Sequence, residues 1–507
     1  MLARNKICAV VAAVQSDPMR RQLQLALRQT RTVELRLDWL SDDREITHFL
    51  KGLAAAKLCG TFIATCRRRE AGGRYPGTIA GQLFHLAEAI QAGCLWYDLE
   101  IETVSQCPPE LLDVLLGEGR QLRSAHFFQR MPPNLKGVAT ALMRGRRPEA
   151  IKIAAHCHSL ADSLKLLRFA RLGHDIVAIP MGDVTLPVRL LSLREGSALT
   201  YAPVEHPTAP GQVSLDEAKT VYRADKIDRQ TRIYAVIGDP IGHSLSPIMH
   251  NAGFQARKMN AVYLPFLVHD LKDFLASIKF LGIQGFSVTI PHKESILRYL
   301  DDCDPLARKI GAVNTVVVRR GGKLYGYNTD YVGVMRALEP RIPLRNSRVL
   351  ILGAGGAARA VAFALAQAGA AVCVCARRTA RAKSLALAVR GQSIARNRLR
   401  YDFFDAIVNA TPVGMYPRVT QSPLETAELN CRLVFDTIYR PRETRLLQLA
   451  ARRDIQTVSG LDMFVAQGAA QWEIWTSERA PIANMRRAVI RALQREEESR
   501  TIVRTRR

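Results

Sequence analysis

Residues 1–226 alternate between apolar runs and amphipathic segments, and this repeating pattern restricts the possible folds more than any other feature of the chain. Short apolar runs bounded by polar residues are typical of buried strands, and the segments between them have the spacing of helices. Eight such repeats in this length predict a (β/α)8 barrel, the TIM barrel. The predicted strands are Ile7–Val14, Val33–Leu40, Phe62–Arg67, Leu95–Ile101, Leu122–Phe128, Ala150–Cys157, Asp175–Met181 and Leu199–Glu205.

Polar side chains lie near the carboxyl ends of these predicted strands, where the active site of such a barrel forms. Glu34 and Arg36 alternate with leucines on the second strand, so their side chains share one side of it. The third strand ends at Arg67, and the fifth contains His126. The sequence therefore predicts a charged site at this end of the barrel.

Lys152 is the most informative of these residues because it interrupts the apolar run 150–155. On an edge strand such a lysine protects against aggregation, but a closed barrel has no edges. A lysine stripped of water can act as a neutral amine, which attacks a ketone and forms a Schiff base. His126, on the preceding strand, would take the proton that the iminium makes acidic, although a histidine on a strand is by itself more often structural.

Several short fragments of the first half, in their order and spacing, resemble type I 3-dehydroquinate dehydratase: Glu34–Asp38, Thr65–Arg67, Ser124–His126, Lys152 and Ala209–Gln212. The resemblance implies that Lys152 forms an imine with the substrate ketone and that His126 is the general acid–base in the loss of water. It also implies that Arg189 binds the substrate carboxylate. The residues that would hold the substrate hydroxyls or order the site are Glu34, Arg36, Arg67, Thr208 and Gln212.

Two positions depart from the pattern of that family. The family has an acidic residue directly before a Gly-Gly pair, whereas this chain has Ala71 there and Glu70 one place earlier. Thr208 stands where a serine is usual, which keeps a hydroxyl at that position. The acidic side chain of the family pattern is thus displaced by one position.

The second half centres on the segment Gly353-Ala354-Gly355-Gly356-Ala357-Ala358, which joins an apolar strand to an alanine-rich helix. Its first glycine allows a tight turn, its second lets a pyrophosphate approach the backbone, and its last alanine lets the helix pack closely. The next strand ends in Arg377 and Arg378 instead of the acidic residue that binds the ribose of NAD. Two guanidinium groups there favour the 2′-phosphate of NADP, or else form a basic surface pair.

Two further pairs precede this segment. Ser244 and Ser246 stand just before a predicted helix, where hydroxyls and helix amides together bind an anion such as a carboxylate; the simpler interpretation is a helix cap. Lys293 ends a predicted strand and Asp330 follows another. Beside a nicotinamide, a lysine and an aspartate would transfer a proton during carbonyl reduction, whereas elsewhere they more often form a structural ion pair.

In this order the fragments resemble shikimate dehydrogenase over residues 233–490. The resemblance implies that Ser244 and Ser246 bind the substrate carboxylate and that Lys293 and Asp330 are the catalytic pair. It assigns the hydroxyls of the substrate to Thr289, Asn314, Asp330 and Gln467. Besides the glycine segment and the arginine pair, it assigns the NADP site to Thr411, Met415, Tyr439, Gly460 and Met463.

These patterns divide the chain into an α/β protein of three parts. Residues 1–226 would form the barrel, and residues 232–340 a substrate-binding lobe completed by helices within residues 461–495. Residues 345–460 would form a Rossmann lobe that binds NADP. A chain of 507 residues has room for several such cores.

The formal net charge of +26 is the unusual feature of the composition. A nucleic-acid partner would explain it, but no RNA-binding signature of aromatic and glycine residues is present, and basic residues are spread along the chain. We therefore expect no nucleic-acid partner and attribute the charge to a surface that attracts small anions. The cluster His156-Cys157-His158 lacks spaced partner ligands, so no metal is expected.

The expected location is the cytoplasm. Ten cysteines without a CxxC pair are typical of a reducing compartment, and we expect no apolar stretch of the chain to cross a membrane. The start at Met1 runs into the first predicted strand, so no secretory signal is expected.

Taken together, the residues predict a lysine-dependent lyase joined to an NADP-dependent reductase. The resemblance implies that 3-dehydroquinate is dehydrated to 3-dehydroshikimate, which is then reduced to shikimate. Two alternatives stay open from the sequence. One is a quinate or shikimate dehydrogenase with an impaired dehydratase barrel, and the other is a basic nucleic-acid-binding protein without catalysis.

Overall fold

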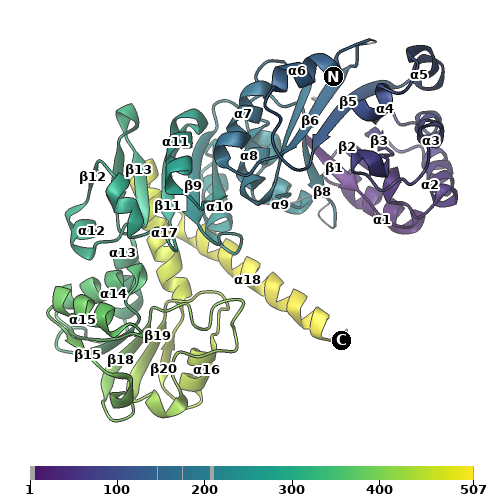
Figure 1. Cartoon of the computed structure of the whole chain (residues 1–507). Helices are drawn as coiled ribbons and strands as arrows, with labels where there is room; N and C mark the ends of the chain where they lie inside the picture. The colour runs from purple at the N-terminus through teal and green to yellow at the C-terminus, as the bar shows by residue number, and fades with distance from the viewer. Residues whose placement is uncertain (1–5, 146, 174, 206–210, 506–507) are drawn as a thin grey trace. The chain divides into compact units, whose positions relative to one another are not determined.

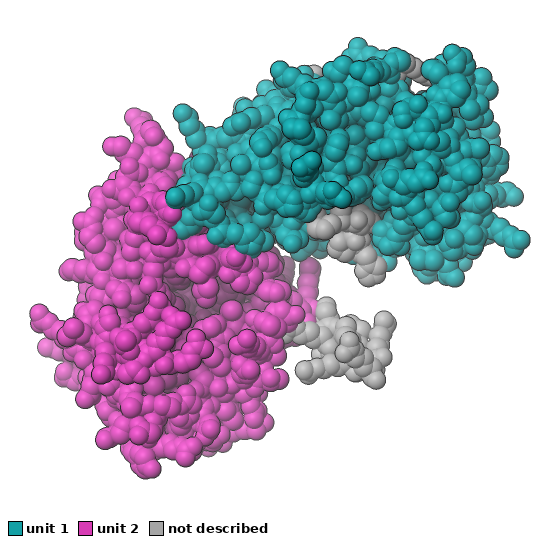
Figure 2. Space-filling view, in the orientation of Figure 1, with its two compact units in different colours: residues 1–231, 264–281 teal, residues 232–263, 282–507 magenta. Residues whose placement is uncertain are grey.

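The computed structural model describes residues 6–145, 147–173, 175–205 and 211–505. Contacts within the chain divide it into two compact units, coloured separately in Figure 2. Unit 1 comprises residues 1–231 and 264–281, and unit 2 comprises residues 232–263 and 282–507. Each unit has its own core and is described by itself.

Unit 1 contains a sheet of eight parallel strands in the order β7-β6-β5-β4-β3-β2-β1-β8, ringed by helices (Figure 1). Ala198, just before β8, donates its backbone N–H to Ile176 of β7 at 2.9 Å, which joins the two ends of the sheet. The predicted barrel is therefore confirmed. Its strands are β1 (Ile7–Val11), β2 (Thr32–Arg36), β3 (Thr61–Thr65), β4 (Trp96–Glu100), β5 (Arg120–Phe127), β6 (Ala150–His156), β7 (Ile176–Met181) and β8 (Thr200–Pro203).

The helices of this barrel begin where short polar side chains cap them. Asp42 accepts hydrogen bonds from two backbone amides of α2, and Ser159 accepts one from α7. Such caps satisfy amides that have no partner within the helix. The helices are α1 (Ser16–Leu27), α2 (Asp43–Ala56), α3 (Ile79–Gln91), α4 (Ile101–Val104), α5 (Pro109–Leu116), α6 (Leu135–Leu142), α7 (Leu160–Ala170), α8 (Leu186–Leu191) and α9 (Leu215–Thr220).

Alternation along β6 decides which side chains face the barrel interior. Ala150 and Ala154 belong to a cluster formed by residues of several strands, whereas Ile151 and Ile153 pack in a cluster with α7. Because successive residues of a strand face opposite sides, Lys152 shares the inner side with the two alanines. The fold thus directs this lysine into the barrel.

Unit 2 contributes most of a six-stranded mixed sheet with the order β10-β9-β11-β13-β14-β12. Strand β11 pairs parallel with β9 and antiparallel with β13. The strands are β9 (Arg232–Gly238), β10 (Ala261–Leu267), β11 (Ile283–Val288), β12 (Asp302–Cys303), β13 (Thr315–Val318) and β14 (Leu324–Tyr327). The helices between and after them are α10 (Ser246–Ala256), α11 (Leu271–Leu281), α12 (Pro305–Ile310) and α13 (Asp330–Leu338).

The remaining sheet has six strands in the order β17-β16-β15-β18-β19-β20, and its pairings are all parallel. Such a sheet with helical crossovers is the Rossmann arrangement expected from the glycine segment. Its strands are β15 (Arg348–Leu352), β16 (Ala371–Cys375), β17 (Gln392–Ser393), β18 (Phe404–Asn409), β19 (Cys431–Asp436) and β20 (Gln456–Val458). Its helices are α14 (Gly356–Gln367), α15 (Thr379–Ala388) and α16 (Arg445–Ala451).

Two helices follow the Rossmann sheet and return to the first part of unit 2. Helix α17 (Gly460–Thr476) packs against α13, and α18 (Ile482–Thr505), yellow in Figure 1, packs against α10. Within the described ranges, no helix is both long and apolar enough to cross a membrane. In the same ranges, no three His, Cys, Asp or Glu side chains are grouped as metal ligands.

Candidate active sites

Lys152 lies inside the barrel and is 4% exposed. Its Nζ contacts a carboxylate oxygen of Asp98 and lies 3.5 Å from Oε1 of Glu34. The same nitrogen lies 4.9 Å from the centre of the Tyr201 ring. The amino group of Lys152 is therefore buried between two acidic side chains and an aromatic ring.

Asp98, on β4, connects the charged residues of this site. Ser124 donates to its Oδ1 at 2.6 Å, and Arg67 donates to the same oxygen at 3.2 Å. Burial would raise the pKa of Asp98, but the positive charges of Lys152 and Arg67 outweigh burial and hold that pKa well below its usual range. No role for Asp98 was predicted from the sequence, because only the register of β4, β5 and β6 brings it to the lysine.

His126 lies on β5, beside the strand that carries Lys152. Burial, with the nearby charges of Arg67 and Lys152, holds the pKa of His126 well below its usual range. The imidazole is thus neutral at physiological pH and can accept a proton. Its buried Nδ1 has no hydrogen-bond partner among the residues that the structure describes.

The other residues expected at this site lie in different parts of unit 1. Glu34 is buried and accepts a hydrogen bond from Thr65 at 2.9 Å, while Arg36 forms a two-point ion pair with Asp38 at 2.9 and 2.8 Å. Arg189 lies on α8, where burial lowers its pKa to about 10. Gln212 lies in the loop before α9, and Thr208 lies outside the described residues.

Glu70 does not replace the acidic residue of the dehydratase pattern at position 71. Its exposed carboxylate pairs with Arg68 at 2.5 Å, whereas the neighbouring Ala71 is buried. The displaced acidic side chain is therefore exposed and pairs with a buried arginine.

The second site is a cavity of about 310 Å³ in unit 2. Its lining includes most residues that the sequence assigned to the reductase, drawn from the mixed sheet, the Rossmann sheet and α17. These residues are Ser244, Ser246, Thr289, Lys293, Asn314, Asp330, Ala357, Thr411, Met415, Tyr439, Met463 and Gln467. The fold thus brings together residues that lie far apart in the sequence.

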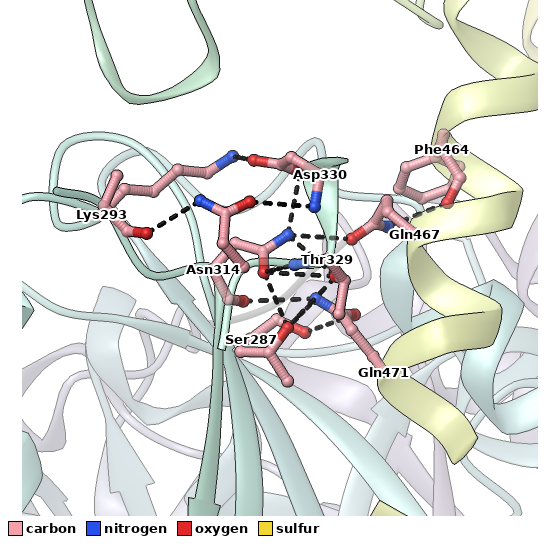
Figure 3. Close-up of polar contacts among 11 residues, drawn as sticks. Ser287, Lys293, Asn314, Thr329, Asp330, Phe464, Gln467 and Gln471 are labelled. Atoms are coloured by element: carbon pink, nitrogen blue, oxygen red, sulfur yellow. Dashed lines mark hydrogen bonds and ion pairs between the residues drawn. The ribbon is translucent and has the colours of Figure 1, made fainter. Parts of the chain in front are cut away.

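Lys293 and Asp330 form an ion pair within this cavity (Figure 3). The Nζ of Lys293 donates to Oδ2 of Asp330 at 2.5 Å, and Asn314 donates to Oδ1 at 2.8 Å. Asp330 is the first residue of α13 and is 5% exposed. The side chain of Asp330 therefore lies between the lysine and the amino end of α13.

A buried polar network that the sequence did not predict lies behind this pair. Ser287 donates to Gln471 at 2.9 Å, and Gln471 donates to the backbone oxygen of Asn314 at 3.2 Å (Figure 3). Gln471 lies one helical turn after Gln467 on α17, so both amides face the same side. This spacing was the signal in the sequence that could have revealed Gln471.

The glycine segment fits the pyrophosphate of a dinucleotide. Gly353 follows β15 with a φ of +109°, and α14 begins at Gly356. A side chain at Gly355 would meet no atom within 4 Å, which leaves open space before the amino end of the helix. Since helix amino ends attract phosphates, these residues could hold a dinucleotide here.

The remaining predicted cofactor residues surround this segment. Arg377 and Arg378 are exposed directly after β16, the strand next to β15. Gly460 starts α17 where a side chain would meet the Thr437 backbone oxygen at 2.3 Å, and Tyr439 stacks on Phe464 with ring centres 4.0 Å apart. Burial raises the pKa of Tyr439, so its hydroxyl stays protonated.

Family models match both halves of the chain. A model described as Type I 3-dehydroquinase matches residues 7–229. Models of the Shikimate dehydrogenase substrate binding domain, of Shikimate / quinate 5-dehydrogenase and of the Shikimate 5'-dehydrogenase C-terminal domain match residues 236–316, 337–458 and 460–490.

Similar proteins show the same division. The Bifunctional 3-dehydroquinate dehydratase/shikimate dehydrogenase, chloroplastic, of Arabidopsis thaliana is 34% identical over 94% of this chain and 82% of that protein. The Shikimate dehydrogenase (NADP(+)) of Bacillus cereus (strain ATCC 10987 / NRS 248) is 45% identical over 52% of this chain and 99% of that protein. A Thermus thermophilus shikimate 5-dehydrogenase, solved with NADP(H) and shikimate, is 36% identical over 52% of this chain and 100% of that chain, with a TM-score of 0.48.

The fold and the two sites define a metabolic enzyme that joins a lyase barrel to a dinucleotide-dependent dehydrogenase. The chain belongs to the family of bifunctional 3-dehydroquinate dehydratase/shikimate dehydrogenases. The family and the fold class expected from the sequence are thereby confirmed, as is NADP as the cofactor of the dehydrogenase.

Proposed function

We propose that this chain dehydrates 3-dehydroquinate in the barrel through a Schiff base on Lys152 and reduces the product, 3-dehydroshikimate, to shikimate at the second site. The observation that carries the first step is the buried Nζ of Lys152 on the strand next to His126. The second step is supported by the Lys293–Asp330 pair in a cavity that Ala357 of the glycine segment also lines.

In the dehydratase site, the lone pair of Lys152 adds to the substrate ketone, and loss of water from the adduct gives an iminium. His126 removes a proton from the neighbouring carbon, and the resulting enamine expels the β-hydroxyl, which leaves as water after protonation by the same imidazole. Hydrolysis of the iminium releases the enone and returns the amine. The low pKa of His126 keeps the imidazole neutral and ready to accept the first proton.

In the dehydrogenase site, Ser244 and Ser246 would bind the substrate carboxylate, and Thr289, Asn314 and Gln467 its hydroxyls. NADPH supplies a hydride when bound, with the glycine segment at its pyrophosphate and Arg377 and Arg378 at its 2′-phosphate. The Lys293 ammonium would donate the proton that the carbonyl oxygen gains. Asp330 holds that ammonium in place at 2.5 Å.

We also keep the three-part division as a proposal: residues 1–226 for the dehydratase, residues 232–340 with 461–495 for substrate binding, and residues 345–460 for NADP. It is supported by the separate sheets of the two lobes and by the return of α17 to α13. We place the protein in the cytoplasm as a reducing compartment, since all ten cysteines are free thiols.

The test uses purified protein with 3-dehydroquinate and NADPH, following enone absorbance and NADPH oxidation together. Enone should form first and then decline as NADPH is oxidised. Borohydride added with 3-dehydroquinate should fix one substrate-derived mass on wild-type protein and none on Lys152→Ala. Lys165→Ala, which removes an exposed lysine of α7, is the matched control and should still be trapped. Trapping that persists in Lys152→Ala would place the nucleophile elsewhere.

A further inference from the structure

Arg440 lines the cavity of the dehydrogenase site from the loop that follows β19. Its Nη1 donates to the backbone oxygen of His243 at 2.6 Å, and its Nε lies 2.8 Å from Oε2 of Glu496 on α18. The side chain is 17% exposed. The guanidinium group is therefore held from two sides, while further N–H donors of the same group are available for other contacts.

The positive charge of Arg440 lies in the same cavity as Ser244 and Ser246. His243 directly precedes Ser244, and the backbone amide of Ser246 donates to the Ser244 hydroxyl at 3.3 Å. His243, Ser244, Ser246 and Arg440 all line the same cavity. Two hydroxyls without a nearby cation would bind a carboxylate weakly, because hydrogen bonds with an ionised partner on both sides are the strong ones.

The other charged residues of the cavity do not supply this positive charge. Lys293 and Asp330 pair with each other at 2.5 Å. Their opposite charges therefore leave little net positive charge to attract an anion. Glu496 pairs with Arg440 but does not belong to the cavity lining in the described part of the chain. Arg440 is thus the cation placed to meet an anion at the serine pair.

We propose that Arg440 binds the carboxylate of the dehydrogenase substrate together with Ser244 and Ser246, and that Glu496 is a positioning residue that fixes the guanidinium group. This assignment rests on the proposed dehydrogenase function. It makes Arg440 the determinant of specificity for acidic substrates over neutral ones. It also gives α18 a role in positioning Arg440, since Glu496 pairs with the guanidinium group from that helix.

The experiment compares the oxidation and the equilibrium binding of shikimate and of its methyl ester, with NADP as the oxidant. The ester keeps the ring hydroxyls and lacks the negative charge. Arg440→Ala should raise the KM and Kd for shikimate about 10- to 100-fold, as expected for loss of one charge-assisted hydrogen bond. Its KM for the ester should change less than about twofold, and kcat for shikimate should stay within about threefold of the wild-type value.

Arg442→Ala is the matched control because it removes the same charge from an exposed position on the same loop. It should leave the preference for acid over ester unchanged, and the oxidation of the ester by each variant reports that unit 2 is folded. Glu496→Gln should raise the KM for shikimate less than Arg440→Ala does. An unchanged ratio of acid to ester in Arg440→Ala overturns the assignment alone, whereas a wild-type protein that neither binds nor oxidises shikimate overturns the proposed function and the assignment together.

Discussion

At the scale of single residues, the contacts of Asp98 lead to a prediction about dehydratase activity. Its carboxylate contacts Lys152, Ser124 and Arg67 in a buried site, so Asp98→Asn would leave Arg67 without its buried counter-charge and Lys152 without this carboxylate. Removing one partner of a buried charge pair costs roughly 2–5 kcal/mol. We expect dehydratase kcat/KM to fall at least about 30-fold, since about 2 kcal/mol in the reacting state has that effect.

The dehydrogenase activity of the same preparation is the internal control for Asp98→Asn. It should remain within about twofold of the wild-type value, because its catalytic pair lies in unit 2. Steady-state rates of the two reactions, measured on one sample, check this. Equal loss of both activities would mean that the substitution damages the whole chain.

A second prediction at this scale concerns Asp436, which is fully buried at the end of β19. It accepts hydrogen bonds from Thr444 at 2.7 Å and from Asn409 at 3.0 Å, and Asn409 in turn accepts one from the hydroxyl of Thr411 in the cavity wall. Burial raises the pKa of Asp436 to about 6. The carboxyl therefore keeps its proton in the folded state at a pH where the unfolded chain has already lost it.

A raised carboxyl pKa means that Asp436 contributes less stability as the pH rises from about 4 through about 6. In Asp436→Asn the carboxyl group is replaced by an amide, which does not titrate in this pH range. The free energy of unfolding of the variant relative to wild type should shift by about 2 kcal/mol in favour of the variant between pH 4.5 and pH 8. Urea unfolding at several pH values measures this, and a difference that is constant across the range would contradict the raised pKa.

At the scale of elements, two glycines in the turn after β15 are expected to have different roles, one in folding and one in binding the cofactor. Gly353 has a φ of +109°, and a side chain there would lie 3.0 Å from the backbone oxygen of Ala410. Gly353→Ala should therefore lower the free energy of unfolding by about 1–2 kcal/mol. Gly355→Ala meets no atom within 4 Å, so it should fold normally but raise the Kd for NADPH at least about tenfold, because its methyl enters the space left for a pyrophosphate.

Chemical unfolding and NADPH fluorescence titration on both variants distinguish these two roles. The pair is its own control, since each variant adds one methyl group to the same turn. If Gly355→Ala bound NADPH as tightly as wild type, the pyrophosphate would have to lie elsewhere.

Elements with a strong local pattern could be predicted, and those set by pairing between strands could not. The run predicted at Ala150–Cys157 is observed as β6 (Ala150–His156), because a mostly apolar run is typical of a strand that is buried on both sides. The run predicted at Val33–Leu40 ends as a strand at Arg36, and Leu37–Trp39 form a short 3₁₀ helix. Sequence alone does not show that Arg36 turns back to pair with Asp38, since that contact depends on the break.

The sites follow the same rule. The Lys293–Asp330 pair was predicted from the motifs and is observed at 2.5 Å, whereas Asp98 and Gln471 needed the registers of strands and helices before their contacts became visible. The catalytic and binding roles of the residues remain predictions. The net charge of +26 could be read from composition, but composition does not tell which basic residue meets a ligand.

At the scale of the whole molecule, the two sets of reacting residues belong to different units. Lys152 and His126 lie in unit 1, and Lys293 and Asp330 lie in unit 2. The barrel sheet of unit 1 and the Rossmann sheet of unit 2 have separate hydrophobic clusters, so a change in one site should leave the other site intact. One chain would then carry two reactions that can be inactivated separately.

Lys152→Ala should abolish dehydration and keep shikimate oxidation within about twofold of wild type. Lys293→Ala should lower shikimate oxidation at least about 100-fold and leave dehydration unchanged. An equimolar mixture of the two variants should again convert 3-dehydroquinate and NADPH to shikimate. The mixture should show a lag, because 3-dehydroshikimate must leave one molecule and accumulate in solution before the other can reduce it. Absorbance of the enone and of NADPH, recorded together against wild type at the same site concentration, measures the lag. A mixture that never consumes NADPH, although each variant keeps its own activity, would show that the two sites do not share a free intermediate.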